Sequence, residues 1–448
     1  LMLDMQQAAE HVLFLAERHG LKDVDALIER EDALEVEIRE GKVEKVEQST
    51  SLGLGVRVLR DGKTGLASTE RLDADAIERA FQSALENSEL QDPTEVLLPE
   101  AANGFSPPES LEIYNSNLEN LTSKDLAELG LVIEGAAKNA DTRVSTIPYL
   151  GVSRNSSELL LVNTKGTRYH QRNNSVGAYC GALLQDGDVR KTGMRFWNQR
   201  LWNPEAGQHI GEEAVRKGAE LLQAQPIPSG KLPVVLDEYV VPRLLGIYFG
   251  AFSAESAQKG MSRLKGKLGE AIAIPELTLL DDPHRIGGNR SRFLDAEGIP
   301  TQPMPLIENG VFRNFLYHVE SGRKDNRTST GHAGRSYSGG VSTRTHNLVW
   351  PLGDSTLEQL CATPEECLLV TQLDGAAGCN PISGDISIGV QGFLYRNGER
   401  VQPVDSITIA GNFFDLLTQV KATGNAYQPN LTHLFIPALL VEGFSISG

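Results

Sequence analysis

The sequence is poor in cysteine and has no long apolar run. Its 448 residues contain four cysteines, no two of them in CxxC spacing, so we expect reduced thiols rather than a disulfide framework or a zinc knuckle. A membrane-spanning helix needs roughly 20 apolar residues, whereas the densest apolar run, residues 434–441, is interrupted by Pro437. The N-terminal residues lack the charged and apolar regions of a signal peptide. We therefore expect a cytoplasmic protein without a membrane partner.

Positive charge is also scarce. Lys and Arg number 42 against 59 Asp and Glu, which gives a formal net charge of −17. A surface this acidic repels phosphate backbones, and the longest basic stretch, residues 263–267, is short, so we expect no direct contact with nucleic acid. The apolar share of 40% and the charged share of 23% are typical of a folded globular chain, long enough for about two to four domains.

Local motifs of the common enzyme classes are absent. The sequence has no HExxH or HExxxH metalloprotease motif, no GxSxG nucleophile elbow, no GxxxxGKS/T phosphate loop and no GxGxxG at a helix start. None of the nine histidines pairs with another at metal-ligand spacing. The residues alone therefore indicate a multi-domain protein without a self-evident active site.

Hydrophobic periodicity predicts an α+β module over residues 1–92. A helical apolar stripe opens the chain and is followed by alternating strands with turns at residues 41–42 and 61–62, which together indicate an antiparallel meander. Residues 53–55 (GLG) lie inside one alternating strand pattern, so we interpret them as an adjustment of that strand rather than a dinucleotide-binding turn.

A proline-rich linker, residues 93–121, is expected to connect this module to a middle α+β module, residues 122–228. The remainder, residues 229–448, is rich in glycine and in short apolar runs. This pattern predicts a large, mainly antiparallel β domain of curved or barrel-like form, because curling or closure protects the edges of many short strands. One long helix is expected over residues 239–264.

The acidic pair Asp237-Glu238 lies between an expected strand, residues 232–236, and that long helix. An Asp at such a place accepts hydrogen bonds from free backbone N–H groups, and a Glu in the first turn opposes the helix dipole. A structural role is therefore favoured for this pair. Turns are expected at residues 281–283 (DDP) and 295–298 (DAEG).

Five phrases of the C-terminal part resemble, in order and spacing, the TldD/PmbA (TldE) family. They are residues 279–283 (LLDDP), 293–301 (FLDAEGIPT), 307–311 (IENGV), 330–334 (TGHAG) and 407–412 (ITIAGN). The opening helix, the meander and residues 162–166 (VNTKG) resemble the first and middle modules of the same family. The resemblance thus spans nearly the whole chain.

The resemblance implies a zinc-dependent peptidase that trims peptide precursors or degrades unfolded peptides, in a family also labelled modulators of DNA gyrase. Its zinc-bearing members carry an HExxxH motif in the C-terminal domain and a cysteine near the chain end, which hold the metal with one position open. Here the motif positions fall on Asp237, Glu238 and Pro242, and the cysteine position falls on Leu431. Since Pro and Leu cannot bind zinc, the resemblance implies no catalytic residue and no metal in this chain.

The leading hypothesis is therefore a PmbA (TldE)-like, non-catalytic subunit of a zinc metalloprotease, a pseudo-enzyme that acts on peptides through its partner. The resemblance implies a TldD-type catalytic subunit that carries the zinc. It also implies a dimer, either with that subunit or with a second copy of this chain.

Two alternatives stay open. The chain could be a peptidase by itself, with metal held by His332, His433, His318 or the Asp237-Glu238 pair. It could also be a regulatory binding protein of the gyrase-modulator type that acts without proteolysis. Metal bound by the isolated chain would favour the first alternative, and recovery of gyrase without a TldD-type subunit would favour the second.

Overall fold

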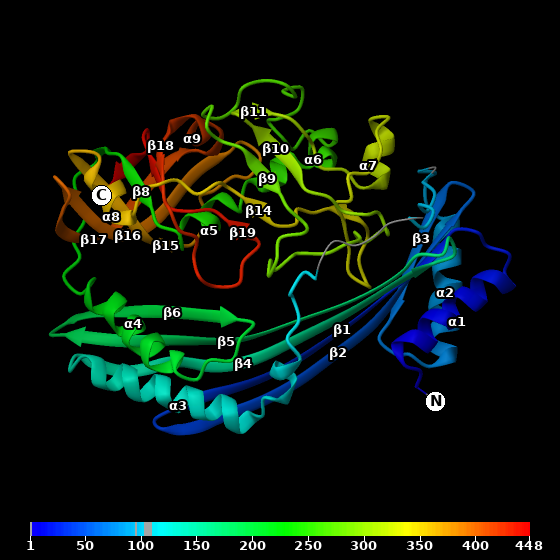
Figure 1. Ribbon diagram of the computed structural model, residues 1–448, viewed down its shortest axis with the longest axis horizontal. Coiled ribbons are helices and arrows are strands. Elements are labelled where there is room, and N and C mark those ends of the chain that lie inside the picture. The colour runs from blue at the N-terminus through cyan, green and yellow to red at the C-terminus, as the bar shows by residue number, and fades with distance from the viewer. Residues whose placement is uncertain (1, 95, 103–109) are drawn as a thin grey trace.

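Two meanders that lie apart in the sequence join in one six-stranded antiparallel sheet (Figure 1). The computed structural model describes residues 2–94, 96–102 and 110–448. The strand order is β3-β2-β1-β4-β5-β6. The strands are β1 (Val24–Arg39), β2 (Lys42–Arg60), β3 (Lys63–Thr69), β4 (Val144–Asn163), β5 (Arg168–Asp186) and β6 (Val189–Gln199). The pairing of β1 with β4 makes one sheet of the expected N-terminal and middle modules.

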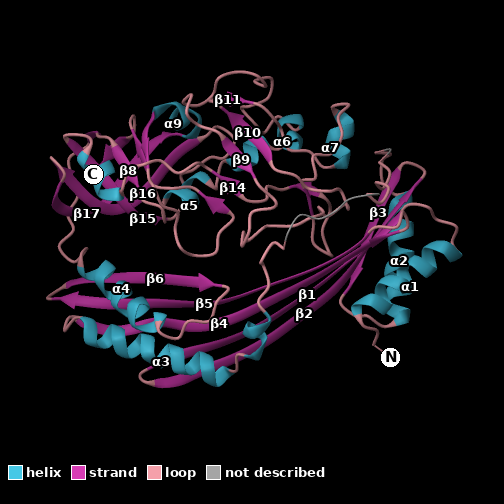
Figure 2. Ribbon diagram, in the orientation of Figure 1, coloured by secondary structure: helices cyan, strands magenta, loops and turns pink. Residues whose placement is uncertain are grey.

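Four helices cover one face of this sheet, two at each end (Figure 2). The first pair is α1 (Met5–Arg18) and α2 (Ala74–Glu89), and the second pair is α3 (Ser123–Ala140) and α4 (Ala206–Ala219). Side chains alternate across a strand. In β1, Ile28 packs in the core under the first pair and Val36 in the core under the second, so both pairs lie on the even-numbered face. The odd-numbered face, which carries Asp25 and Glu29, is turned toward the C-terminal domain.

The segment between the two modules is irregular where the structure describes it. It passes through residues 96–102 and 110–115 and then forms the short helix η1 (Ser116–Asn120). Pro107 and Pro108 of the expected linker lie outside the described residues. The start of α3 is a capping box, because the Asp125 N–H donates to the Thr122 side chain and the Thr122 N–H donates to the Asp125 carboxylate.

The C-terminal domain confirms the expected curved, mainly antiparallel β architecture and with it the α+β class (Figure 2). One sheet has the order β18-β20-β8-β15-β16-β17-β21-β7 and another the order β11-β10-β9-β14-β19, with a further two-stranded sheet of β12 and β13. Between them lies the largest apolar core, in which Tyr248, Phe252, Phe312 and Phe413 are buried. The strands are β7 (Gly230–Lys231), β8 (Val234–Leu236), β9 (Leu279–Asp281), β10 (Met304–Glu308), β11 (Val311–Phe312), β12 (Ala333–Gly334), β13 (Ser342–Thr343), β14 (Leu348–Val349), β15 (Glu366–Asp374), β16 (Asp385–Arg396), β17 (Glu399–Asn412), β18 (Val420–Thr423), β19 (Leu434–Phe435), β20 (Leu439–Val441) and β21 (Ser445–Ser447).

The long helix expected over residues 239–264 was wrong. That segment forms three short helices, namely α5 (Val241–Leu245), η2 (Phe249–Phe252) and α6 (Ala254–Gln258). Ser253 has extended backbone and caps α6 with its side chain, which separates the second helix from the third. The segment is buried on several sides, so its dense apolar residues mimic one helical stripe. The remaining helices of the domain are α7 (Val319–Lys324), α8 (Leu357–Ala362) and α9 (Phe413–Gln419), and within the described ranges no helix is both long and apolar enough to cross a membrane.

A buried ion-pair cluster joins the sheet to the C-terminal domain. The Arg57 guanidinium of β2 contacts the carboxylates of Asp25 at 2.6 Å and Glu297 at 2.8 Å, and Arg335 contacts Asp25 at 2.6 Å. Each of these side chains is at most 3% exposed. Burial raises the pKa of Asp25, but Arg335 and Arg57 outweigh burial and hold that pKa below its usual range. The cluster is therefore charged on both sides and balanced.

Beside this cluster, two glycines of β2 let the loop around Tyr337 approach the sheet. A Cβ on Gly55 would lie 1.9 Å from the Tyr337 carbonyl oxygen, and one on Gly53 would lie 2.3 Å from its ring. The Tyr337 N–H also donates to the Glu29 carboxylate at 2.8 Å. The GLG segment is thus part of a strand, as expected, and its glycines provide close approach rather than a phosphate turn.

We predict that Arg57→Met destabilises the protein by about 3–5 kcal/mol, because it leaves the buried Asp25 and Glu297 carboxylates without their shared partner. Urea unfolding measures the change. The matched control is Arg396→Met, since Arg396 pairs with Glu366 on the surface with exposures of 54% and 32%. The control should cost less than about 1 kcal/mol, and equal losses for the two variants would contradict the prediction.

Candidate functional site

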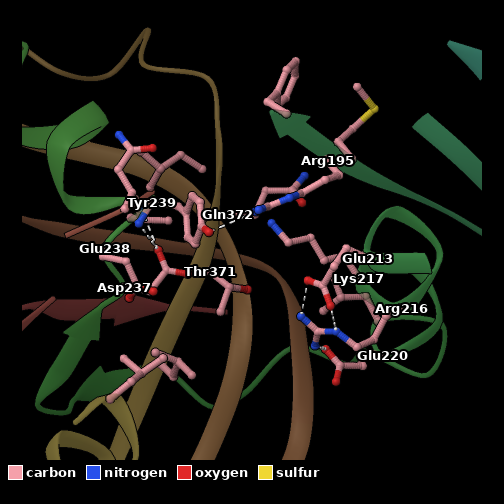
Figure 3. Close-up of a pocket in the computed structure, with 18 of the residues that line it drawn as sticks. Arg195, Glu213, Arg216, Lys217, Glu220, Asp237, Glu238, Tyr239, Thr371 and Gln372 are labelled. Carbon is pink, nitrogen blue, oxygen red and sulfur yellow. Dashed lines mark hydrogen bonds and ion pairs between the residues drawn. The ribbon is translucent and has the colours of Figure 1, made fainter. Parts of the chain in front are cut away.

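The largest cavity lies between the edge of the six-stranded sheet and the C-terminal domain. It measures about 750 Å³ and is open to solvent on one side. β6 and α4 form one wall, and the turn after β8 together with β15 forms the other (Figure 3). The charged lining residues are Arg195, Glu213, Arg216, Lys217, Glu220, Asp237, Glu238, Arg243 and Arg400.

Asp237 shapes the turn that leads from β8 into α5. Its carboxylate accepts hydrogen bonds from the N–H groups of Tyr239 at 3.0 Å and Val240 at 2.7 Å. Burial and the neighbouring Glu238 carboxylate raise the pKa of Asp237 to about 7, against these hydrogen bonds and the attraction of Lys217. The side chain therefore organises backbone at the cavity wall, which agrees with the structural role favoured by the sequence.

The other two motif positions are also occupied by structural residues. Pro242 is buried in the first turn of α5, where a proline is well tolerated. Leu431 donates its backbone N–H to the Asn198 carbonyl of β6 at 3.0 Å. The structure thus places Asp237, Glu238 and the segment around Leu431 at one cavity, with the neighbouring Asn430 in its lining.

Two cations gather on the opposite wall beside Tyr239 (Figure 3). The Arg195 guanidinium donates to the Tyr239 hydroxyl at 3.0 Å, while the Lys217 ammonium lies 5.0 Å from the centre of the Tyr239 ring. Burial and the positive charge of Arg195 lower the pKa of Lys217. The Arg195 Nε atom is buried and has no hydrogen-bond partner among the described residues. This pair of cations is suited to an anionic group that enters the cavity.

Arg216 lines the same cavity but is already neutralised. Its guanidinium contacts Glu213 at 2.8 Å and Glu220 at 2.8 Å, both on or beside α4. Arg195 and Lys217 are therefore the cations with free binding capacity on this wall. Sequence analysis missed both, although an arginine between the buried Gly193 and Trp197 of an alternating strand is a recognisable signal.

The three candidate histidines lie outside this cavity and apart from one another in role. His332 is fully buried beside Asp281 and His346. His433 lines a second cavity of about 330 Å³. His318 precedes α7, where its Nδ1 atom lies 2.9 Å from the Thr343 hydroxyl. The structure thus brings His332 to a histidine that the sequence analysis did not single out.

Three family domains match successive parts of the chain. They are the PmbA/TldA metallopeptidase domain 1 over residues 24–88, the central domain over residues 116–222 and the C-terminal domain over residues 229–448. The chain belongs to the PmbA/TldD metallopeptidase family. The match confirms the resemblance found in the sequence.

Relatives in this family align along almost their whole length. A metalloprotease PmbA homolog of Haemophilus influenzae is 29% identical over 99% of this chain and 96% of its own. Metalloprotease PmbA of Escherichia coli O157:H7 is 28% identical over 94% of this chain and 91% of its own.

Solved structures of family members share the whole fold. A Thermotoga maritima protein described as a modulator of DNA gyrase superposes with a TM-score of 0.88 at 27% identity, covering 99% of this chain and all of that one. TldE of Thermococcus kodakarensis gives a TM-score of 0.88 at 24% identity and covers 98% of this chain and all of its own, a likeness of fold. The sheet and the curved C-terminal domain are therefore the architecture of the PmbA/TldD family.

We predict a pH-dependent stability effect for Asp237→Asn. The folded-state pKa of about 7 lies above the ordinary value of 3.8, so the folded chain holds a proton that the unfolded chain releases. The stability contributed by Asp237 therefore falls as pH rises from about 4 to about 7. The Tm of D237N relative to wild type should rise when thermal unfolding at about pH 5 is compared with about pH 8.

The control for this experiment is Asp141→Asn. Hydrogen bonds from Arg143 lower the pKa of Asp141 to about 2, so its contribution to stability is present throughout that pH range. The Tm of D141N relative to wild type should be the same at both pH values. An equally constant difference for D237N would contradict the assignment of a raised pKa to Asp237.

Proposed function

We propose that this chain is a PmbA/TldE-like, non-catalytic subunit of a TldD/PmbA-type zinc metalloprotease that processes or degrades peptides. The supporting observation is the fate of the ligand positions at the main cavity. Asp237 has its carboxylate engaged by backbone N–H groups, and Pro242 and Leu431 have no lone pair to offer a metal. Glu238 then has no metal-bound water to activate at this cavity. The catalytic zinc would belong to a TldD-type partner.

The cavity is suited to an extended peptide. Its lining combines the Arg195 and Lys217 cations with the Asp237 and Glu238 carboxylates on the facing wall, which complements a main chain with charged ends or side chains. Main-chain recognition of this kind tolerates many peptide sequences. In this proposal the subunit grips the peptide, and the partner cleaves it.

The alternative of an independent peptidase needs a metal with an open, accessible position. Asp281, His332 and His346 form a group that could hold a metal among the described residues, but all three are buried away from the main cavity. A peptide bond has no access to them there. The gyrase-modulator alternative is carried by the description of the Thermotoga maritima relative, and a pull-down that recovers gyrase without a TldD-type subunit would favour it.

The proposal predicts that hydrolysis requires a partner. We expect the purified chain, with zinc added, to leave a quenched fluorescent unstructured peptide uncut, and a mixture with a TldD-type protein to form a complex that cuts it. Glu238→Gln in this chain should keep the activity of the complex within about twofold, whereas the same change in the partner's HExxxH motif removes the metal-activating base and should abolish it. Hydrolysis by the chain alone that is lost in E238Q would overturn the proposal.

Peptide binding by this chain can be tested separately from cleavage. We predict that Lys217→Gln weakens the binding of a labelled unstructured peptide with a free carboxyl end by about tenfold, the usual cost of one charged hydrogen bond. Fluorescence anisotropy measures the affinity. Arg216→Gln is the matched control, since its partners Glu213 and Glu220 lie within the protein. Equal affinities of wild type and K217Q would show that the peptide does not reach this wall.

A further inference from the structure

A buried carboxylate in the C-terminal domain is enclosed by two imidazoles. Asp281 ends β9 and is 0% exposed. The His332 Nε2 atom lies 3.5 Å from one of its oxygens, and the His346 Nδ1 atom lies 3.4 Å from the other. His332 comes from the loop before β12 and His346 from the segment before β14, so three separate segments meet at this carboxylate.

Both imidazole nitrogens lack a hydrogen-bond partner. Their separations from Asp281 exceed the 2.7–3.2 Å of ordinary N–H···O hydrogen bonds, and both atoms are buried and unpaired among the described residues. The Asp281 carboxylate itself is held in place by the His346 backbone N–H at 2.9 and 3.1 Å. Two unpaired nitrogens aimed at one fixed carboxylate need a shared partner.

The spacing of the three groups is that of ligands around one metal ion. Zinc–nitrogen and zinc–oxygen bonds of about 2.0–2.1 Å in tetrahedral geometry place neighbouring ligand atoms about 3.3–3.4 Å apart. The 3.4 and 3.5 Å separations match this value, and all three ligand atoms lie within 4.8 Å of one another. Two imidazoles and one carboxylate are a donor set that zinc accepts.

Surrounding contacts support the same assignment. The second ring nitrogen of His332, Nδ1, lies 2.8 Å from the Thr330 hydroxyl. When Thr330 donates to the Tyr317 carbonyl at 3.1 Å, its oxygen accepts the Nδ1–H of His332, and Nε2 presents its lone pair to the site. The ion-pair contacts of Asp281 are with the two imidazoles, whereas the equally buried Asp25 has two guanidinium partners.

We propose that Asp281, His332 and His346 bind one divalent transition-metal ion, zinc by preference, as a structural site that ties three segments of the C-terminal domain together. The site is separate from the family motif position at the main cavity, and it departs from the sequence-based expectation that this chain holds no metal. A small cavity of about 230 Å³ lined by His346 offers the ion a path and a place for a water ligand. Arg290 and Arg344 line it too and repel a free cation, so loss of one ligand should abolish binding.

The test is metal binding by the full-length chain, purified without an affinity metal and stripped with EDTA. After zinc addition and removal of excess, elemental mass spectrometry should find about one zinc per chain in wild type and less than about a tenth of that in His332→Gln and His346→Gln. The matched control, His433→Gln, should keep the wild-type content. Cobalt(II) in place of zinc should give a visible absorption band in wild type and H433Q alone.

A second measurement does not depend on the folding of the ligand variants. EDTA should lower the Tm of wild type, and added zinc, but not magnesium, should restore it. No zinc uptake by wild type, or equal uptake by H332Q and H346Q, would overturn the proposal and leave the proposed function intact. Zinc that persists in H332Q and H346Q but is lost in Glu238→Gln would place metal at the main cavity, and would contradict both this site and the non-catalytic role.

Discussion

The charge cluster of Asp25, Arg57, Glu297 and Arg335 is the constraint on which the arrangement of the molecule depends. It joins two strands of the sheet to two loops of the C-terminal domain, and it is stable in a dry environment only when all four partners are present. The long strands of the sheet run from this junction to the edge where the main cavity lies (Figure 1). The position of the cavity walls relative to one another therefore depends on a contact made at the other end of the sheet.

At the main cavity, the residues at the metal-binding positions of the family have become part of the wall. Asp237 holds a turn, Pro242 fits the first turn of a short helix, and Leu431 is tethered to β6. The cavity itself persists, with two cations and two carboxylates facing one another. Loss of a metal site without loss of the surrounding space is consistent with a subunit that binds what another subunit cuts.

Local patterns predicted much of the fold, because strand alternation and turn chemistry act over a few residues. The turns at Gly41 and Gly62 have positive φ, as the hairpins require, and Thr122 caps α3. The β1–β4 pairing could not be foreseen, since no local signal sets the register of strands more than 100 residues apart. The same holds for the cation pair and for His332 with Asp281, which only the tertiary fold brings together. The supposed long helix failed because burial on several sides imitates a helical stripe.

The central place of β1 also has a consequence for biosynthesis. β1 and β2 are complete on the ribosome well before β4 emerges, so one edge of β1 waits with unpaired N–H and C=O groups until residue 163 has been made. Helices α1 and α2 can cover one face of this early hairpin but cannot protect its open edge. The first 90 residues are thus an incomplete folding unit, and a gene rearrangement that separated them from the middle strands would create two aggregation-prone fragments.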